Sequence, residues 1–153
     1  MPDFVTGAGT TFSLAAAQPA TYTGPGYVAL TWVPVGKLTN IGDVPDRVYE
    51  IVSLNYVASA GTDKAKGNFA LGSQTLTMAI DTADTGQILL NTATNSTARY
   101  SIKIAHASLG TIYAQALVMG GPKTYGDGNT AATRQVTIEY TIVSATETGL
   151  VVV

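Results

Sequence analysis

The chain has 153 residues, of which 46% are hydrophobic and 12% are charged, about half the charged fraction of roughly 25% in an average soluble domain. Because it has no Cys and a single His, the sequence excludes disulfides, thiolate metal sites and multi-histidine metal centres. With a net charge of -2, nothing in the composition indicates a basic surface that binds nucleic acid phosphates. We expect one domain over residues 1–153, with no cofactor and no bound metal.

The sequence also lacks the features of a membrane or secreted protein. No apolar run reaches the ~18 to 20 residues needed to cross a bilayer. Residues 1–4 carry an acid where a secretion signal has basic residues, and Gly7 and Gly9 interrupt any apolar stretch that follows. We therefore expect no membrane contact and a chain that is made and kept inside a cell.

The first half of the chain predicts an extended arm followed by strands. Residues 1–25 are rich in Ala, Thr, Gly and Pro and predict an arm that precedes a β core over residues 26–143. Strands are predicted at Val28–Thr39 and Tyr49–Val57, where apolar residues without strict alternation indicate cover on both faces. The polar segment Ala58–Asn68 predicts a long loop, and loops of this length are usually functional or disordered.

A helix interrupts the run of strands in the second half of the chain. Asp84 is a suitable N-cap, and the residues after it place apolar side chains at three- and four-residue spacing as far as Ala93. This pattern predicts a short helix. We expect Ile88, Leu89 and Ala93 to cover one open face of the sheet.

The remaining strands are predicted to have one buried face and one solvent-exposed face. The clearest is Gln135–Ile142, in which every second residue is apolar, a period of two that a helix cannot use. Alternation also predicts strands at residues 75–80 and 100–104, and an apolar run predicts one at Ile112–Met119. A second long polar connection is predicted at Gly120–Thr133, and residues 144–153 are expected to be a C-terminal tail. The chain is thus expected to be mainly β, with antiparallel strands.

Candidate catalytic and ligand-binding motifs are each better explained by structural roles. His106 has no accompanying Ser and acid signature, so we interpret it as a surface or packed histidine. Gly61–Gly67 lacks the spacing of a phosphate-binding loop and predicts a flexible loop tip. Asp127–Asn129 lacks the later Glu of a calcium loop and predicts a turn, as do Asp43 and Asp46. Because no nucleophile, base and orienting group can be assembled, we do not expect an enzyme.

Several segments occur in a distinctive order, namely Trp32–Val44, Lys64–Asn68, Thr75–Thr77, Asp84–Leu90, Tyr100–Ile104 and Tyr113–Ala116. Over residues 26–143 they resemble the tail tube protein of long-tailed, non-contractile phages. Gene transfer agents, which are phage-like particles encoded by their host, carry similar tubes. The resemblance implies an antiparallel β-sandwich or half-barrel with one short flanking α-helix. It also implies six-membered rings that stack into a hollow tube through which DNA leaves the capsid.

On this resemblance the chain is a structural virion protein that is assembled in the bacterial cytoplasm and located in the particle tail. Its implied partners are other copies of itself within and between rings, the tape measure protein, the tail terminator and the distal tail or baseplate proteins. DNA would pass through the lumen without specific binding, which fits a chain of low and slightly negative charge.

Two groups of residues and the arm are the candidate assembly elements. A loop is predicted to reach the adjacent ring, and its residues are Ala60, Gly61, Thr62, Asp63, Lys64, Ala65 and Lys66. The wet face of the last strand is predicted to line the lumen, and its residues are Gln135, Thr137, Glu139 and Thr141. The extended arm is predicted to be mobile in the unassembled subunit and ordered in the tube.

The alternative function is a monomeric binding module, such as a sugar-binding β-sandwich on a virion or cell surface. Such a module would share the Thr-rich, Cys-free composition but would need an exposed aromatic platform. Trp32 is the only Trp and lies in a largely apolar segment, so we interpret it as a core or interface residue. The state of assembly distinguishes the two functions.

Overall fold

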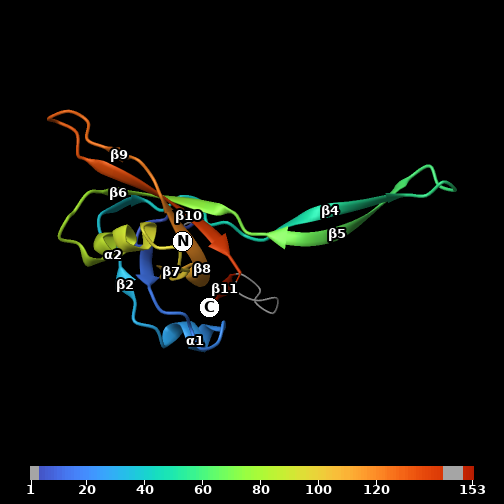
Figure 1. Ribbon diagram of the computed structural model, residues 1–153, viewed down its shortest axis with the longest axis horizontal. Helices are drawn as coiled ribbons and strands as arrows, with labels where there is room; N and C mark the ends of the chain where they lie inside the picture. The colour runs from blue at the N-terminus through green and yellow to red at the C-terminus, as the bar shows by residue number, and fades with distance from the viewer. Residues whose placement is uncertain (1–3, 143–149) are drawn as a thin grey trace.

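A curled antiparallel sheet forms most of the computed structural model, which describes residues 4–142 and 150–153 (Figure 1). In chain order the elements are β1 (Thr11–Ala15), α1 (Gly24–Val28), β2 (Val33–Pro34), β3 (Leu38–Asn40), β4 (Val48–Asn55), β5 (Thr62–Ala70), β6 (Ser73–Ala79), α2 (Thr85–Thr94), β7 (Tyr100–His106), β8 (Gly110–Gly120), β9 (Lys123–Thr124), β10 (Thr133–Thr141) and β11 (Val151–Val152). The main sheet follows the order β2-β1-β7-β8-β10-β6-β3, with β9 on β10 and β11 on β8. The predicted fold class, a mainly β antiparallel half-barrel with a short flanking helix, is confirmed.

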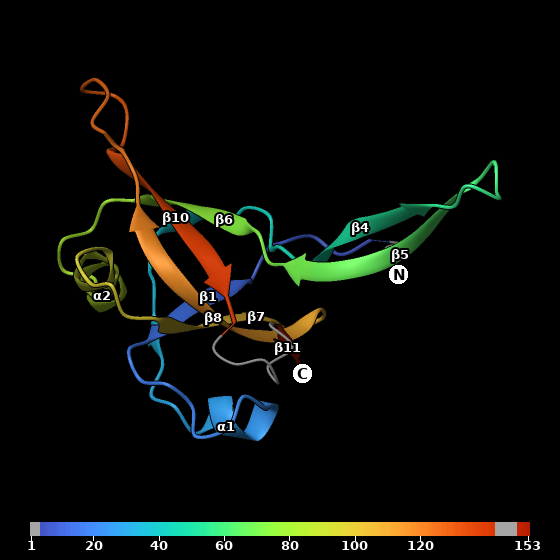
Figure 2. The ribbon, with the colours of Figure 1, turned by 45° about the vertical axis from the view of Figure 1, so that its right-hand side comes forward.

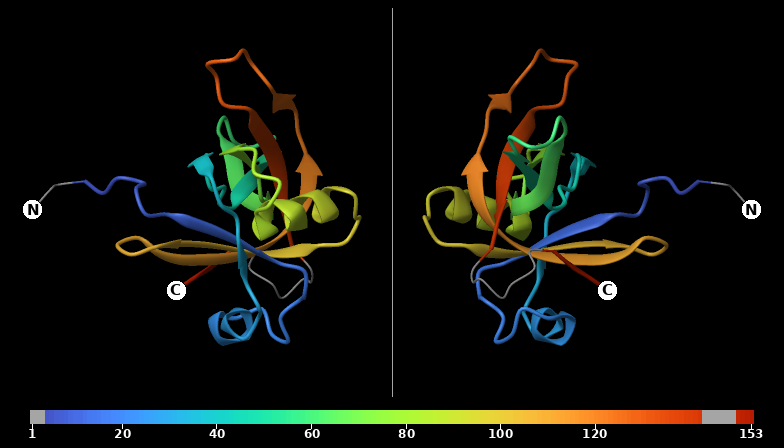
Figure 3. Two further views of the ribbon diagram at one scale, coloured as in Figure 1. Left: turned by 90° about the vertical axis from the view of Figure 1, so that its left-hand side faces the viewer. Right: turned by 90° about the vertical axis from the view of Figure 1, so that its right-hand side faces the viewer.

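The alternating strands enclose the core. In β10, Val136, Ile138 and Tyr140 are at most 3% exposed. Strand pairing keeps apolar residues together, because Val136 lies opposite Leu76 of β6 and Ile138 lies opposite Val118 of β8. Figure 3 shows how the sheet curls, so that β10 runs across β1 and β7 with α2 in the angle between them. The curl therefore gives one sheet an enclosed interior.

The helix α2 begins directly after the N-cap that the sequence predicts. Asp84 Oδ2 accepts a hydrogen bond of 2.9 Å from the backbone N–H of Gln87, which satisfies a donor that the first helical turn leaves open. Leu90 and Ala93 are fully buried in the core. The expectation that Ile88 covers the sheet is wrong, since Ile88 is 49% exposed. The same expectation is confirmed for Ala93, and Leu89 is partly buried against the core. The buried stripe consists of Gln87, Leu90 and Ala93, at three-residue spacing.

The predicted N-terminal arm contains a strand of the core. Thr11–Ala15 form β1, which lies between β2 and β7, and neither Phe12 nor Leu14 has exposed surface. These side chains lie opposite Ile104 and Ile102 of β7. Only two apolar residues alternate in so short a strand, and the Ala, Gly and Pro residues around it hide the pattern. The expectation of an extended arm is therefore wrong for residues 11–15.

The single strand predicted at Val28–Thr39 is interrupted. α1 ends at Val28, β2 contains only Val33–Pro34, and β3 begins at Leu38. Lys37 has a φ of 60°, a left-handed conformation that residues other than glycine adopt infrequently. Because this conformation is incompatible with a strand, the chain turns before β3.

Aromatic rings pack on the face of the sheet opposite the core. Tyr27 of α1 is fully buried, and its ring stacks on Tyr113 of β8 with centroids 5.2 Å apart. Trp32 is half-buried and its ring centroid lies 5.7 Å from that of Tyr113. The Trp32 Nε1 donates a 3.0 Å hydrogen bond to the Tyr27 carbonyl oxygen. The half-buried Trp32 thus packs against the outer face of the sheet, and its role as an interface residue stays a prediction.

The connection predicted at Gly120–Thr133 is partly a hairpin, because β9 pairs with the start of β10. Asp127 forms a turn, as the sequence predicts: its Oδ1 accepts hydrogen bonds from the backbone N–H of Asn129 and from Thr130 Oγ1. These two hydrogen bonds hold the pKa of the exposed Asp127 carboxyl below its ordinary value.

Replacing a buried residue of β1 tests whether this segment belongs to the core before assembly. Phe12→Ala is expected to lower the free energy of unfolding by about 3–5 kcal/mol, because the Phe12 side chain is fully buried. The control is Phe4→Ala, since Phe4 is 73% exposed and its loss should cost less than about 0.5 kcal/mol. Chemical denaturation of the unassembled subunit measures both. If both variants lowered the free energy of unfolding by the same amount, residues 11–15 would not be part of the core of the unassembled subunit.

Candidate functional site

A two-stranded hairpin projects from the curled sheet and forms a separate small sheet (Figures 1 and 2). β4 and β5 pair from Val48 opposite Ala70 at the base to Asn55 opposite Thr62 near the tip. The prediction of a loop over residues 60–66 is therefore wrong for most of the segment, which continues from the tip along β5. Both faces of this part of β5 are exposed. Because no face has to be apolar, the segment lacks the alternation of apolar and polar residues that marks a strand, and its polar sequence is typical of a loop.

The hairpin exposes a strand that is rich in apolar side chains. Every residue of β4 is exposed, including Val48 and Ile51 at 70% and Leu54 at 55%. The strand predicted at Tyr49–Val57 exists, but the expectation that it is covered on both faces is wrong for the single chain. Since an isolated two-stranded hairpin is marginally stable in water, exposed apolar surface of this kind indicates a partner surface.

Aromatic and cationic side chains stabilise the base of the hairpin. The rings of Tyr49 and Phe69 pack across the two strands with centroids 5.5 Å apart. Lys66 Nζ lies 4.9 Å from the Tyr49 ring centroid, and the Arg47 guanidinium carbon lies 5.8 Å from that of Phe69. These distances fall within the range of cation–π attraction. The base of the hairpin thus has ring contacts of its own that hold the two strands together.

The outer face of β10 presents the four residues that were predicted to line a lumen. Gln135 and Glu139 are exposed, and Thr137 and Thr141 are half-buried. The polar surface continues onto β6, because Glu139 lies opposite Ser73. Glu139 forms no ion pair within residues 4–142 and 150–153. This face is therefore a polar surface of Thr, Ser and Gln with a negative charge.

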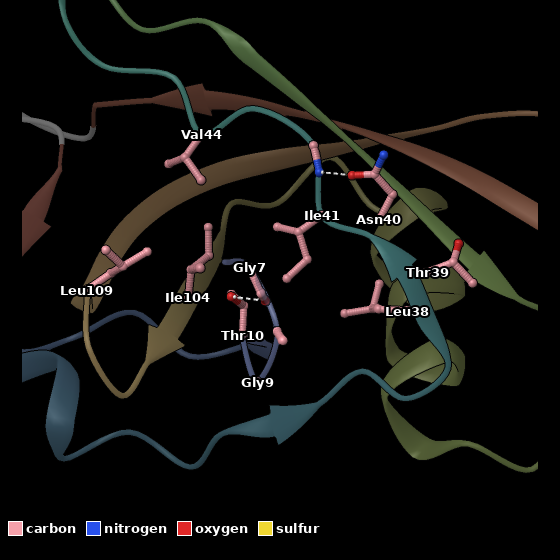
Figure 4. Close-up of a pocket in the computed structure, with 12 residues that line it drawn as sticks. Gly7, Gly9, Thr10, Leu38, Thr39, Asn40, Ile41, Val44, Ile104 and Leu109 are labelled. Carbon is pink, nitrogen blue, oxygen red and sulfur yellow. Dashed lines mark hydrogen bonds between the residues drawn. The ribbon is translucent and has the colours of Figure 1, made fainter. Parts of the chain in front are cut away.

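A groove of about 590 Å³ opens between the N-terminal segment, β3 and the end of β7 (Figure 4). Its apolar wall residues are Leu38, Ile41, Val44, Ile104 and Leu109. The lining has no His, Lys, Arg, Asp or Glu, so the groove offers no pair of groups for acid–base catalysis. Sequence reasoning missed it because its walls come from separate segments, one of which was expected to be an arm.

His106 supports the turn between β7 and β8. Its Nδ1 accepts hydrogen bonds from the backbone N–H groups of Ser108 and Leu109, and its Nε2 donates to the Ala8 carbonyl oxygen at 2.9 Å. This pattern requires a neutral imidazole with its proton on Nε2. Both ring nitrogens are thus occupied, and the interpretation of His106 as a packed histidine is confirmed.

The described residues contain no group of three or more His, Asp and Glu side chains that could hold a metal ion. None of the helices they form is long and apolar enough to span a membrane.

Solved structures resemble this chain over almost its whole length. A chain in the tail of an empty GTA particle, computed with helical refinement and C6 symmetry, matches with a TM-score of 0.65 at 12% identity, covering 98% of this chain and 99% of that chain. A chain in the six-fold symmetrised cryo-EM structure of the anti-feeding prophage (AFP) baseplate matches with a TM-score of 0.62 at 9% identity, covering 93% and 95%.

A chain in the virion of a native gene transfer agent (GTA) particle matches with a TM-score of 0.61 at 10% identity, again covering 93% of this chain and 95% of that chain. No protein-family model and no curated protein matches the sequence. At these identities the likeness establishes a shared fold. That fold thus occurs in chains of two GTA particle structures and of the AFP baseplate.

Proposed function

We propose that the chain is a structural subunit of a phage-like tail tube, in which six copies form a ring and the rings stack into a hollow tube that conducts DNA. The observation that carries this proposal is the full-length likeness to a chain in a GTA tail with C6 symmetry. The resemblance of residues 26–143 to tail tube proteins of non-contractile phages supports the same class. The role is structural, and catalysis has no part in it.

Assembly into a ring would cover the edges of the main sheet that are unpaired in the single chain. β2 and β3 are the edge strands of the main sheet, and open edges are prone to aggregation unless a neighbour pairs with them or covers them. Head-to-tail contacts between identical subunits close into a ring when the rotation between neighbours permits it. The same pair of surfaces is then buried in every contact.

Stacking of rings is the proposed task of the projecting hairpin. Its outer part, which includes the predicted stacking residues 60–66, extends well beyond the curled sheet (Figure 1). Because the hairpin contributes little to the core and exposes apolar residues such as Ile51 and Leu54, it is suited to pack on a subunit of the adjacent ring.

The outer face of β10 is the proposed wall of the lumen. Gln135, Thr137, Glu139 and Thr141 offer polar groups and one negative charge, which repels DNA weakly instead of binding it. Further proposed partners are the tape measure protein within the tube, the tail terminator and the distal tail or baseplate proteins at its ends. The proposed location is the tail of a phage or gene transfer agent, after assembly in the bacterial cytoplasm.

Concentration-dependent sedimentation of the purified protein, with electron micrographs of the same samples, tests the proposal. We expect a single subunit at low concentration, and rings and tubes above a critical concentration. A protein that stays monomeric at high concentration and is absent from particle tails would contradict the proposal. That result would favour the monomeric binding module.

A further inference from the structure

A buried cation without an acidic partner lies at the start of β10, beside β9. Figure 1 shows β9 and α2 on the side of the molecule away from the β4–β5 hairpin. Arg134 is 6% exposed, and its Nη1 donates a hydrogen bond to Asn91 Oδ1 of α2. Its Nε is buried without a hydrogen-bond partner. Within the described residues, no Asp or Glu forms an ion pair with Arg134. Burial lowers the pKa of its guanidinium, as expected for a desolvated cation.

A second cation stands directly across the strand pair. Lys123 of β9 lies opposite Arg134 in the register of the sheet. Like charges at opposed positions of neighbouring strands destabilise a sheet, and buried charges in proteins are normally paired. An anion between Lys123 and Arg134 would offset the repulsion between the two cations and would pair the buried charge of Arg134.

The two cations line a pocket of about 120 Å³ between α2 and the β9–β10 hairpin. This volume is well above the roughly 10–15 Å³ that a single water requires, so a carboxylate group fits. Asp81 also lines the pocket, but its Oδ1 accepts a hydrogen bond from the backbone N–H of Ala83. Asp81 forms no ion pair with either cation among the described residues. With two cations and one carboxylate, the pocket keeps a net positive charge.

We propose that this pocket receives the carboxylate of Asp63 from a second copy of the chain, an inference that rests on the proposed tube. Asp63 is the charged residue nearest the hairpin tip, where it lies opposite Leu54. In Figure 1 the β4–β5 hairpin lies at one end of the long axis, and α2 and β9 lie towards the other. The pocket lies between α2 and the β9–β10 hairpin. Head-to-tail stacking brings these two ends together. In the contact, the Arg134 guanidinium and the Lys123 ammonium donate charge-assisted hydrogen bonds to the Asp63 carboxylate.

Charge reversal tests this contact. Lys123→Glu and Asp63→Lys should each raise the critical concentration for tube formation at least about tenfold. The double variant should return it to within about threefold of the wild-type value, because the two changes restore opposite charges. Both side chains are exposed in the single chain, so the variants should fold. Arg99→Glu, at an exposed cation outside both the hairpin and the pocket, is the matched control and should change the critical concentration by less than about threefold.

A disulfide between copies tests the geometry independently of assembly yield. Because the sequence has no Cys, a chain carrying both Asp63→Cys and Lys123→Cys can cross-link only at these positions. Oxidised tubes should give a ladder of covalent multimers on a denaturing gel. Wild-type tubes combined with no ladder and no rescue in the double charge reversal would overturn the pocket assignment and leave the proposed tube intact. A wild-type protein that forms no tubes would refute the proposed function and the contact with it.

Discussion

Shortening the β4–β5 hairpin is expected to abolish tube formation while the subunit stays folded. Replacing residues 52–65 by Asn-Gly joins Ile51 to Lys66, which already lie opposite each other, through a two-residue turn of the type that hairpins favour. All the removed residues are exposed, so the free energy of unfolding should change by less than about 1 kcal/mol. Sedimentation should show only monomer at concentrations at which the wild type forms tubes.

A control for this variant keeps the length of the hairpin and alters only its tip. Ala58→Gly leaves β4, β5 and residues 60–66 unchanged, so tubes should still form. Circular dichroism and chemical denaturation establish that each variant is folded. Tubes of normal length from the folded, shortened variant would show that the hairpin is not a stacking element.

Replacing Glu139 by Lys is expected to leave assembly intact and to slow the passage of DNA. In a six-membered ring the substitution places six cations at one level of the bore, and the rate of DNA release should fall roughly tenfold or more because phosphates are then held electrostatically. Glu139 is exposed and lies opposite Ser73 and Leu117, so the free energy of unfolding should change by less than about 0.5 kcal/mol. DNA release from particles that carry the variant measures the effect.

The matched control for the lumen is Glu139→Gln, which removes the negative charge without adding a cation and should change the release rate by less than about threefold. A cysteine at the same position tests the location directly. In assembled tubes, the Glu139→Cys variant should react with a small thiol reagent and be shielded from one too wide for the channel. Equal reaction with both reagents would place residue 139 on the outer wall.

Strands with one buried face and the capped helix could be predicted from the sequence because each has a local signal. The alternation in Gln135–Ile142 specifies which residues of β10 enter the core. Asp84 marks the start of α2 because its carboxylate accepts a hydrogen bond from a backbone N–H of the first helical turn. The same alternation places Arg134 on the core side of β10, which is the signal from which the buried cation could have been found.

Elements that depend on distant partners could not be predicted in the same way. β1 is buried because β7 lies beside it, and a five-residue strand with two apolar side chains carries too little periodicity to stand out. β4 and the outer part of β5 have two exposed faces, so no buried face imposes an alternation of apolar and polar residues on their sequence. The groove beside Ile104 joins several separate segments, and only the folded chain brings them together.

Cryo-electron microscopy of tubes assembled from the purified protein tests the central claim most directly. We expect stacked rings of six subunits, with the β4–β5 hairpin of each subunit crossing to the adjacent ring and Glu139 on the inner wall. Single copies, or an assembly without six-fold rings around a hollow bore, would contradict the proposal that this chain is a tail tube subunit.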